Sequence, residues 1–329
     1  MSLRVGVIGL GIGKAHVAGY SKLEGVDLVA VCDLERSRVD RFANSSTNGY
    51  TSAVDMLGRE DLDAVSICTP PKAHAGLTVE ALDQGVSVLC EKPMAPSIAD
   101  CDRMVESAKR AGLTLMIGFK KRFDPAYLRL KKIFSDDFGL PYMLCYNYVC
   151  TGGVRKEWFW DEANGGGPIV ENTVHAVDIL RFLLGDVSRV YAEGDATIAG
   201  ERGISQIDAS VFTLRFKKGT MATLCAGSWA KGPLKEERMV AYSERGIAQL
   251  SGEFDRPRSV KISIYGEGSV ESYEIFRSDP ILDEISHFVG CVEKGVEPVA
   301  SGLDGRSALE ICLSVKESAR TGKVISLPI

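Results

Sequence analysis

The feature that most constrains this chain is a short apolar run that passes through three glycines into a helical pattern. Leu3–Ile8 is mostly apolar and predicts a strand buried on both faces of a sheet. Gly9, Gly11 and Gly13 follow it, and a helical pattern runs from residue 14 to residue 23. Such a turn lets the backbone approach a phosphate group, and the helix N-terminus adds N–H donors. The third glycine comes one residue earlier than in G-x-G-x-x-G, so an ordinary tight turn remains an alternative.

An acidic residue at the end of the next strand strengthens the phosphate-binding interpretation. Residues 28–32 predict a second buried strand, and Asp33 closes it. A carboxylate there can accept hydrogen bonds from the adenosine ribose hydroxyls. The pattern therefore predicts a dinucleotide site at Gly9, Gly11, Ile12, Gly13 and Asp33. Asp33 would repel a 2′-phosphate, which favours NAD. Arg36 and Arg38 lie close enough to weaken this preference, and Arg38 is a candidate cofactor contact, although a polar helix favours solvated side chains.

Strands and helices alternate through the first 121 residues. Three more strands are expected, at 64–68, 87–90 and 113–119. Helices are expected between the strands, at 35–43, 72–84 and 97–111. Strands joined by helices run parallel with right-handed crossovers, so residues 1–121 predict a doubly wound α/β sheet, a dinucleotide-binding Rossmann domain.

Residues 122–329 follow a different pattern. Alternating apolar and polar residues, interrupted by turns, predict antiparallel hairpins at 210–226 and 238–264. Helical patterns at 283–293 and 306–320 follow. The length of 329 residues suits two domains. We therefore expect an α/β fold with a second, α+β domain at 122–329, built on an open and mostly antiparallel sheet.

Composition excludes several classes of function. The chain has 39 basic and 44 acidic residues, a net charge of −5. It therefore lacks the excess of positive charge that is typical of proteins that bind nucleic acid or an anionic membrane. No apolar run approaches the ~20 residues of a membrane helix, and the N-terminus opens into a strand rather than a signal peptide. Nine cysteines lack C-x-x-C spacing and four histidines are dispersed, so we expect no metal site and reduced thiols in the cytoplasm.

Polar groups cluster after the third and fourth strands, where such sheets bind their ligands. Thr69 and Pro70 follow the third strand, and His74 comes shortly after them. Glu91 and Lys92 follow the fourth strand. A lysine there could donate to a substrate oxygen, and a surface lysine before a helix is the alternative.

A polar stripe marks a strongly helical pattern at 169–184, which follows three glycines and a proline. On one continuous helix, Glu171, His175 and Asp178 would share a face, with a carboxylate and an imidazole at i, i+4. An imidazole oriented by a carboxylate is a plausible general base for an alcohol proton. A helix-terminal acid and a core histidine are the alternative.

Five ordered motifs make the chain resemble the Gfo/Idh/MocA oxidoreductase family, which includes inositol and sugar dehydrogenases. The motifs are the glycine loop ending at His16, Thr69–His74, Glu91–Pro93, Gly118–Phe123 and Gly165–Asp178. The resemblance implies a Rossmann domain, a domain for substrate binding and oligomerisation with an open antiparallel sheet, a bound NAD or NADP, and hydride transfer at a carbinol carbon. It also implies a small sugar or polyol substrate and a homodimer or homotetramer.

The resemblance implies roles for single residues. Lys92 matches the family's catalytic lysine, His175 its catalytic histidine, and Glu171 the motif acid, which is usually Asp. Lys121 falls where the family has a substrate-binding arginine, so the planar two-pronged donor is lost. A cis peptide bond is implied before Pro93.

These roles complete two expected sets of contacts. Besides the glycine turn, Asp33 and Arg38, the cofactor is expected to contact Thr69, Pro70, His74, Glu91 and Lys92. The substrate is expected to contact Lys121, Trp158, Asn172 and His175. Trp158 and Trp160 would pack against the protein, with sugar stacking as the alternative.

The resulting hypothesis is a dehydrogenase that acts on a sugar, polyol or cyclitol lying between the two domains. His175 takes the hydroxyl proton, Glu171 orients the imidazole, and Lys92 donates to the same oxygen. A glycosidase that retains its NAD and a non-catalytic NAD(P)-sensing regulator are the alternatives. The regulator would be expected to have lost the lysine and the histidine, and both are present.

Overall fold

The structure is a computed structural model that describes residues 2–136, 138–149, 156–228, 236–253, 259–276 and 278–329. The chain divides into two compact units. The first comprises Met1–Lys120 and Pro280–Arg306, and the second comprises Lys121–Asp279 and Ser307–Ile329.

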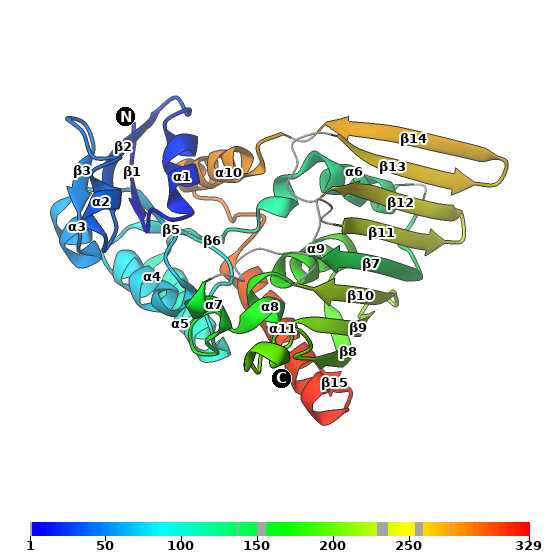
Figure 1. The fold of residues 1–329 in the computed structure, drawn as a ribbon. Helices are drawn as coiled ribbons and strands as arrows, with labels where there is room; N and C mark the ends of the chain where they lie inside the picture. Colours follow the sequence, from blue (N-terminus) through cyan, green and yellow to red (C-terminus); the bar gives the residue numbers. More distant parts are fainter. Residues whose placement is uncertain (1, 137, 150–155, 229–235, 254–258, 277) are drawn as a thin grey trace. The chain divides into compact units, whose positions relative to one another are not determined.

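The first unit contains a six-stranded parallel sheet in the order β3-β2-β1-β4-β5-β6 (Figure 1). The strands are β1 (Leu3–Ile8), β2 (Val26–Cys32), β3 (Asn48–Tyr50), β4 (Ala64–Ile67), β5 (Ser87–Cys90) and β6 (Leu115–Ile117). β4 and β5 are buried along their whole length, which explains their apolar sequences. The strand order reverses between β1 and β4, the place where doubly wound sheets bind ligands. This topology confirms the predicted Rossmann sheet.

Helices connect these strands and one more joins them from late in the chain. They are α1 (Gly13–Tyr20), α2 (Arg36–Val39), α3 (Ala53–Arg59), η1 (Pro71–Ala73), α4 (His74–Asp83), α5 (Ile98–Ala111) and α10 (Pro280–Lys294). α10 lies late in the sequence, just before α11 (Gly302–Thr321), but packs on α1 in the first unit. A Cβ at Gly19 would lie 2.6 Å from Ile285 Cδ1, so glycine permits this close helix contact.

The second unit contains a nine-stranded sheet in the order β14-β13-β12-β11-β7-β10-β9-β8-β15. The strands are β7 (Met143–Val149), β8 (Val187–Asp195), β9 (Ala209–Phe216), β10 (Met221–Gly227), β11 (Glu236–Ser243), β12 (Gly246–Glu253), β13 (Ser259–Gly266), β14 (Ser269–Phe276) and β15 (Ile325–Ser326). β7 and β10 pair in parallel and the other neighbours are antiparallel. The expected mostly antiparallel sheet is therefore confirmed.

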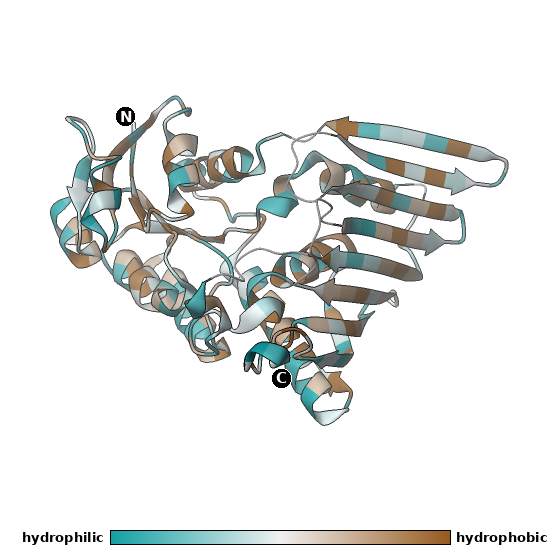
Figure 2. Ribbon diagram, in the orientation of Figure 1, coloured by the Kyte–Doolittle hydropathy of each residue, from teal (hydrophilic) through white to brown (hydrophobic). Residues whose placement is uncertain are grey.

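One face of this sheet is buried and the other is open. Figure 2 shows hydrophobic and hydrophilic residues alternating along several of its strands, and β7 and β9 alternate between buried and more exposed side chains. The unit also contains η2 (Lys120–Phe123), which begins at its boundary, α6 (Pro125–Ser135), α7 (Glu157–Trp160), α8 (Gly167–Glu171), α9 (Val174–Leu184), η3 (Gly200–Arg202) and most of α11 (Gly302–Thr321). α6 packs near β13 and β14, and Ser318 of α11 accepts a hydrogen bond from the Ala192 backbone of β8.

Candidate active site

The three glycines after β1 have separate structural tasks. Gly9 has φ +88°, and a Cβ there would lie 2.7 Å from the Cys68 carbonyl group. A Cβ at Gly13 would lie 3.0 Å from Val7 Cγ1, so this glycine lets α1 pack closely on the sheet. At Gly11, by contrast, an added Cβ would meet no atom of the described residues within 4 Å. A tight turn, an open approach and close helix packing are the three features that a pyrophosphate-binding turn requires.

Asp33 lies at the end of β2 and holds the glycine turn. Its Oδ2 accepts a hydrogen bond from the Leu10 N–H at 2.8 Å, and its Oδ1 accepts one from the Glu35 N–H at 2.9 Å. Oδ2 also accepts from Arg38 Nη1 at 3.5 Å, so Oδ1 retains an acceptor position for a ribose hydroxyl. Arg38 Nη1 lies 3.5 Å from Asp33 Oδ2, and Arg38 Nε lies 2.8 Å from Glu35 Oε2. The guanidinium of Arg38 therefore lies between two carboxylates.

Thr69, at the end of β4, provides a further observation that fits a cofactor. Its hydroxyl is buried and has no hydrogen-bond partner among the residues that the structure describes. Buried hydroxyls almost always have a partner, so an orphaned one at the ligand-binding edge of a Rossmann sheet is compatible with a ligand contact. Together with the glycine turn and Asp33, it shows that the first unit suits a dinucleotide.

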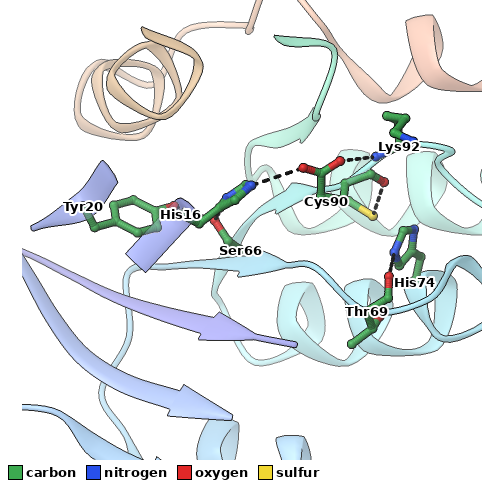
Figure 3. A network of polar contacts seen from close by, with 8 residues as sticks. His16, Tyr20, Ser66, Thr69, His74, Cys90 and Lys92 are labelled. Carbon is green, nitrogen blue, oxygen red and sulfur yellow. Dashed lines mark hydrogen bonds and ion pairs between the residues drawn. The ribbon is translucent and has the colours of Figure 1, made fainter. Parts of the chain in front are cut away.

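Glu91, at the end of β5, is held by a chain of buried polar groups (Figure 3). His16 Nε2 lies 3.3 Å from Glu91 Oε1, and His16 Nδ1 lies 3.0 Å from Ser66 Oγ. Tyr20 OH lies 2.8 Å from the same Ser66 oxygen. Burial would raise the pKa of Glu91, but the hydrogen bond from His16 and its charge, with smaller effects from Lys92, outweigh it and lower that pKa to about 2. Glu91 is therefore a carboxylate at neutral pH.

Lys92 follows Glu91 directly, and its backbone N–H donates to Glu91 Oε2 at 3.1 Å. The Lys92–Pro93 peptide bond is cis, as the family resemblance implied. Lys92 therefore lies at the carboxyl end of β5, two strands away from β1 in the sheet order. The glycine turn and Lys92 thus lie at the same edge of one sheet.

His74 is buried between the segments that follow β4 and β5. Its Nε2 lies 2.8 Å from the Thr69 carbonyl oxygen (Figure 3). Its Nδ1 lies 2.9 Å from the Pro93 carbonyl oxygen. Burial lowers the pKa of His74, and hydrogen bonds to the Thr69 and Pro93 carbonyl oxygens oppose this shift. Both partners are acceptors, so a neutral ring donates to one of them at a time, and a protonated ring donates to both. The structure gives His74 a fully buried linking position, and a direct cofactor contact stays a prediction.

The polar stripe predicted on one helix lies on two. α8 ends at Glu171 and α9 begins at Val174, so the expectation of a continuous helix at 169–184 is wrong. The N–H groups of Asn172 and Thr173 both donate to the Pro168 carbonyl oxygen, which widens the turn at this point. Glu171 and His175 are therefore not related by the i, i+4 geometry of a regular helix. His175 and Asn172 are each only 8% exposed.

Asp178, the third member of the predicted stripe, is engaged in a buried ion pair. Arg122 Nε donates to Asp178 Oδ2 at 2.9 Å, and Arg122 Nη2 donates to Oδ1 at 2.6 Å. Both side chains are almost fully buried. This two-pronged pair fixes α9 to η2, so Asp178 has a structural partner within the second unit.

Lys121 lies in a second buried cluster of the same unit. Its ammonium forms an ion pair with Glu237 of β11, whose Oε1 also accepts hydrogen bonds from Tyr127 and Tyr146. The ammonium also lies 4.9 Å from the centre of the Tyr148 ring. The charge of Lys121 is thus balanced by a carboxylate that lies 116 residues away in sequence and that sequence reasoning did not identify. Substrate binding by Lys121 stays a prediction.

Trp158 and Trp160 flank the buried Phe159 in α7. Both tryptophans are half-buried, and Trp160 meets Phe159 edge to face with ring centres 5.0 Å apart. Lys156 Nζ lies 5.2 Å from the centre of the Trp158 ring. These contacts agree with packing of Trp160.

Two searches bear on other kinds of site. No cluster of three or more metal-ligating side chains occurs among the described residues. Within the same residues, no helix is both long enough and apolar enough to span a membrane.

Comparisons with known proteins find similarity to oxidoreductases along most of the chain. Residues 3–119 match the model of an oxidoreductase family with an NAD-binding Rossmann fold, and residues 127–249 match the GFO/IDH/MocA C-terminal domain. Myo-inositol 2-dehydrogenase of Thermotoga maritima is 27% identical over 338 residues, which cover 99% of this chain and 98% of the relative.

Two solved structures extend the similarity. The myo-inositol 2-dehydrogenase of Lactobacillus plantarum is 26% identical with a TM-score of 0.84, and the alignment covers 100% of both chains. The WlbA dehydrogenase of Bordetella pertussis, in complex with NADH and UDP-GlcNAcA, is 25% identical with a TM-score of 0.85 and the same full coverage.

Proposed function

This chain belongs to the Gfo/Idh/MocA family of oxidoreductases, and we propose that Lys92, His175 and Glu171 carry its reaction. The enzyme uses NAD to oxidise or reduce a CH–OH carbon of a sugar, polyol or cyclitol. The observation that carries the residue assignment is the position of Lys92 at the same sheet edge as the glycine turn and Asp33.

The proposed mechanism divides the proton chemistry between two residues. His175 accepts the proton of the substrate hydroxyl, and Lys92 donates a hydrogen bond to the same oxygen as negative charge develops on it. Glu171 orients the imidazole of His175. When bound, NAD supplies the hydride acceptor, and its pyrophosphate would be held by the glycine turn and its ribose by Asp33. Reduction of a carbonyl uses the same groups in reverse.

The proposed division of labour assigns cofactor binding to residues 1–121 and substrate binding to residues 122–329. The proposed substrate contacts are Lys121, at the end of the first part, and Trp158, Asn172 and His175 in the second part. Lys121 would act with Glu237 beside it, so the pair presents little net charge, which favours a neutral polyol over an anionic sugar.

We also propose that the chain forms a homodimer or homotetramer through the open face of its nine-stranded sheet. A row of apolar side chains crosses this face through register neighbours: Met221, Met143, Tyr242, Ile247, Tyr265 and Val270. Met221 is 49% exposed and Val270 is 63% exposed. Contiguous exposed apolar surface is typical of protein–protein interfaces. Buried free thiols such as Cys68 and Cys90 support a proposed location in the reducing cytoplasm.

A panel of polyols, cyclitols and aldoses, each offered with NAD⁺ and with NADP⁺, tests the proposed function. We expect one or more of them to be oxidised with the appearance of reduced nicotinamide absorbance, and NAD⁺ to be preferred. Release of sugar from a glycoside without net NADH formation would instead identify a glycosidase. Binding of NADH with no turnover of any compound would contradict the enzymatic assignment.

A further inference from the structure

Two buried histidines contact the segment that contains Lys92, and they do so from opposite ends. His16 reaches it through Glu91, whose Oε2 accepts the Lys92 N–H at 3.1 Å. His74 reaches it directly, with Nδ1 2.9 Å from the Pro93 carbonyl oxygen. Both imidazoles have no exposed surface. All of these groups belong to the first unit. Figure 3 shows His16, His74 and Lys92 together.

The direction of the hydrogen bond between His16 and Glu91 is fixed by the charge of Glu91. Glu91 is a carboxylate and can only accept, so His16 Nε2 must carry a proton and donate to it. His16 Nδ1 accepts from the Ser66 hydroxyl when the ring is neutral and donates to Ser66 Oγ when the ring is charged, so the contact is kept in both forms. Burial raises the pKa of Tyr20, so its hydroxyl remains protonated and donates to Ser66. Each member of this chain is fixed by the next, which determines the orientation of Glu91.

On the other side, His74 joins the two strand-end segments to each other. Nδ1 faces the Pro93 carbonyl oxygen and Nε2 faces the Thr69 carbonyl oxygen, so the ring lies between the segment after β5 and the segment after β4, and it donates to Pro93 when Nδ1 carries the proton. A Cβ at Gly118 would lie 3.2 Å from Glu91 Oε2, so the end of β6 also packs tightly against this region. The backbone at Lys92 and Pro93 is thus held by named polar contacts at both residues.

We propose that His16 and His74 are positioning residues that hold the Lys92–Pro93 backbone from its two ends and so aim the Lys92 ammonium. This proposal rests on the proposed catalytic role of Lys92. His16 acts through Glu91 Oε2 and the Lys92 N–H, and His74 acts through the Pro93 carbonyl oxygen. Neither histidine is assigned contact with the reacting atoms.

The chemistry of the two rings provides a sharp test, because each contact uses a different nitrogen. The amide nitrogen of asparagine takes the place of imidazole Nδ1, and that of glutamine takes the place of Nε2. His16 contacts Glu91 through Nε2, so His16→Gln should retain the contact and His16→Asn should lose it. His74 contacts Pro93 through Nδ1, so His74→Asn should retain the contact and His74→Gln should lose it. The expected order of the two replacements is therefore opposite at the two positions.

The experiment measures two quantities for these four variants of the full chain. Hydrogen–deuterium exchange of a peptide that includes the Lys92 amide reports how firmly the segment is held. Turnover with NAD⁺ and the best compound of the panel reports the aim of Lys92. We expect His16→Asn and His74→Gln to exchange faster at this peptide and to lose kcat by about 10- to 100-fold with NADH affinity nearly unchanged. We expect His74→Asn to stay close to the wild type in both measurements. We expect His16→Gln, which retains the Glu91 contact but loses the Ser66 contact, to lose no more than about 3-fold in kcat.

Controls separate positioning from general damage. His287 of α10 contacts Cys291 and the Val299 N–H, so His287→Asn and His287→Gln should leave the Lys92 peptide and kcat unchanged. If His16→Asn does not fold, Ser66→Ala removes a single hydroxyl from the same chain and should give faster exchange at the Lys92 peptide with a loss in kcat of about 3-fold.

The outcomes distinguish this proposal from the proposed function. Equal behaviour of the asparagine and glutamine variants at each position, in exchange and in turnover, would overturn the positioning role. The positioning role would also be overturned if the exchange rates followed the expected order of the variants and the kcat values did not. A wild type that oxidises no compound of the panel would overturn the proposed function, and the exchange order alone would then decide whether the two histidines hold the segment.

Discussion

At the scale of single residues, the account depends on buried polar groups at strand ends. Glu91 and Lys92 can be identified from the sequence, because they are charged residues directly after an apolar strand. Ligands bind at these strand ends in doubly wound sheets. Ser66 carries a weaker signal, as the one polar residue of the buried strand β4, because such a group must find a hydrogen-bond partner. The partners of Lys121 and Asp178 could not be predicted, because Glu237 and Arg122 lie far away in sequence and only the folded chain brings them together.

The first prediction concerns the role of Lys92. Lys92→Ala should lower kcat by at least about 100-fold, because it removes the proposed donor to the reacting oxygen, while NADH affinity stays nearly unchanged. Steady-state kinetics and NADH fluorescence titration provide the measurement. Lys72→Ala, at an exposed lysine of η1, is the matched control and should behave as the wild type. Full turnover by Lys92→Ala would remove this residue from the mechanism.

The second prediction concerns the pH dependence of stability. Burial opposes the ionisation of Glu91, but His16 outweighs it, so the pKa falls from 4.5 to about 2 in the folded protein. Because this pKa is lower in the folded state, the carboxylate stabilises the fold above pH 4.5, and the contribution is lost as the pH falls toward 2. The difference in Tm between wild type and Glu91→Gln should therefore be largest near neutral pH and shrink below pH 4.5.

Circular dichroism melts at about pH 7, 5 and 3 measure this difference. Glu24→Gln, at an exposed carboxylate of the same unit, should show almost no difference from the wild type at any of these pH values. A gap between wild type and Glu91→Gln that is constant down to pH 3 would contradict the assignment of a depressed pKa.

At the scale of elements, the sequence predicts regular strands better than short or interrupted ones. β7 lies at the centre of the second sheet and was not among the predicted strands, although Leu144, Tyr146 and Tyr148 alternate with more exposed residues in its sequence. β3 has three residues and lies at a sheet edge, so it has no apolar run to reveal it. The break between α8 and α9 is hidden by continuous apolar periodicity, because it depends on backbone hydrogen bonds to Pro168.

The third prediction separates two glycines of one turn. Gly9→Ala places a Cβ 2.7 Å from the Cys68 backbone at φ +88°, so it should lower the free energy of unfolding by roughly 1–3 kcal/mol or more. The Cβ added by Gly11→Ala meets no atom of the described residues within 4 Å, so the stability of this variant should be unchanged. Its NADH affinity should fall, because the Cβ occupies the space proposed for the pyrophosphate. Denaturant unfolding and NADH titration of both variants check this difference. Normal NADH affinity in Gly11→Ala would show that no phosphate approaches this position.

At the scale of the whole molecule, the order of motifs was sufficient to predict the Rossmann sheet and the mostly antiparallel sheet that follows it. The sequence did not reveal that Pro280–Arg306 belongs to the first compact unit. The helical pattern of α10 was visible, but its packing on α1 depends on the fit of Gly19 against Ile285. Such complementary surfaces leave no local pattern, so long-range packing requires a structure.

The fourth prediction concerns assembly. Met143→Glu combined with Ile247→Lys places charges in the apolar row of the open sheet face, where both side chains are 37% exposed. The protein should then shift to a monomer in light scattering, with its circular dichroism spectrum unchanged, because charges buried in an interface oppose association. Charges at Val296 and Val324, which are exposed outside this sheet row, should leave the oligomer intact. An unchanged oligomer in the double variant would exclude this face.

The central proposal is that Lys92 and His175 act on one substrate oxygen. The most direct measurement is a crystal structure of the enzyme with NADH and a compound that it turns over. The account predicts that Lys92 Nζ and an imidazole nitrogen of His175 both lie within hydrogen-bond distance of the same oxygen, beside the nicotinamide ring. A complex in which either side chain contacts no reacting group would contradict the account.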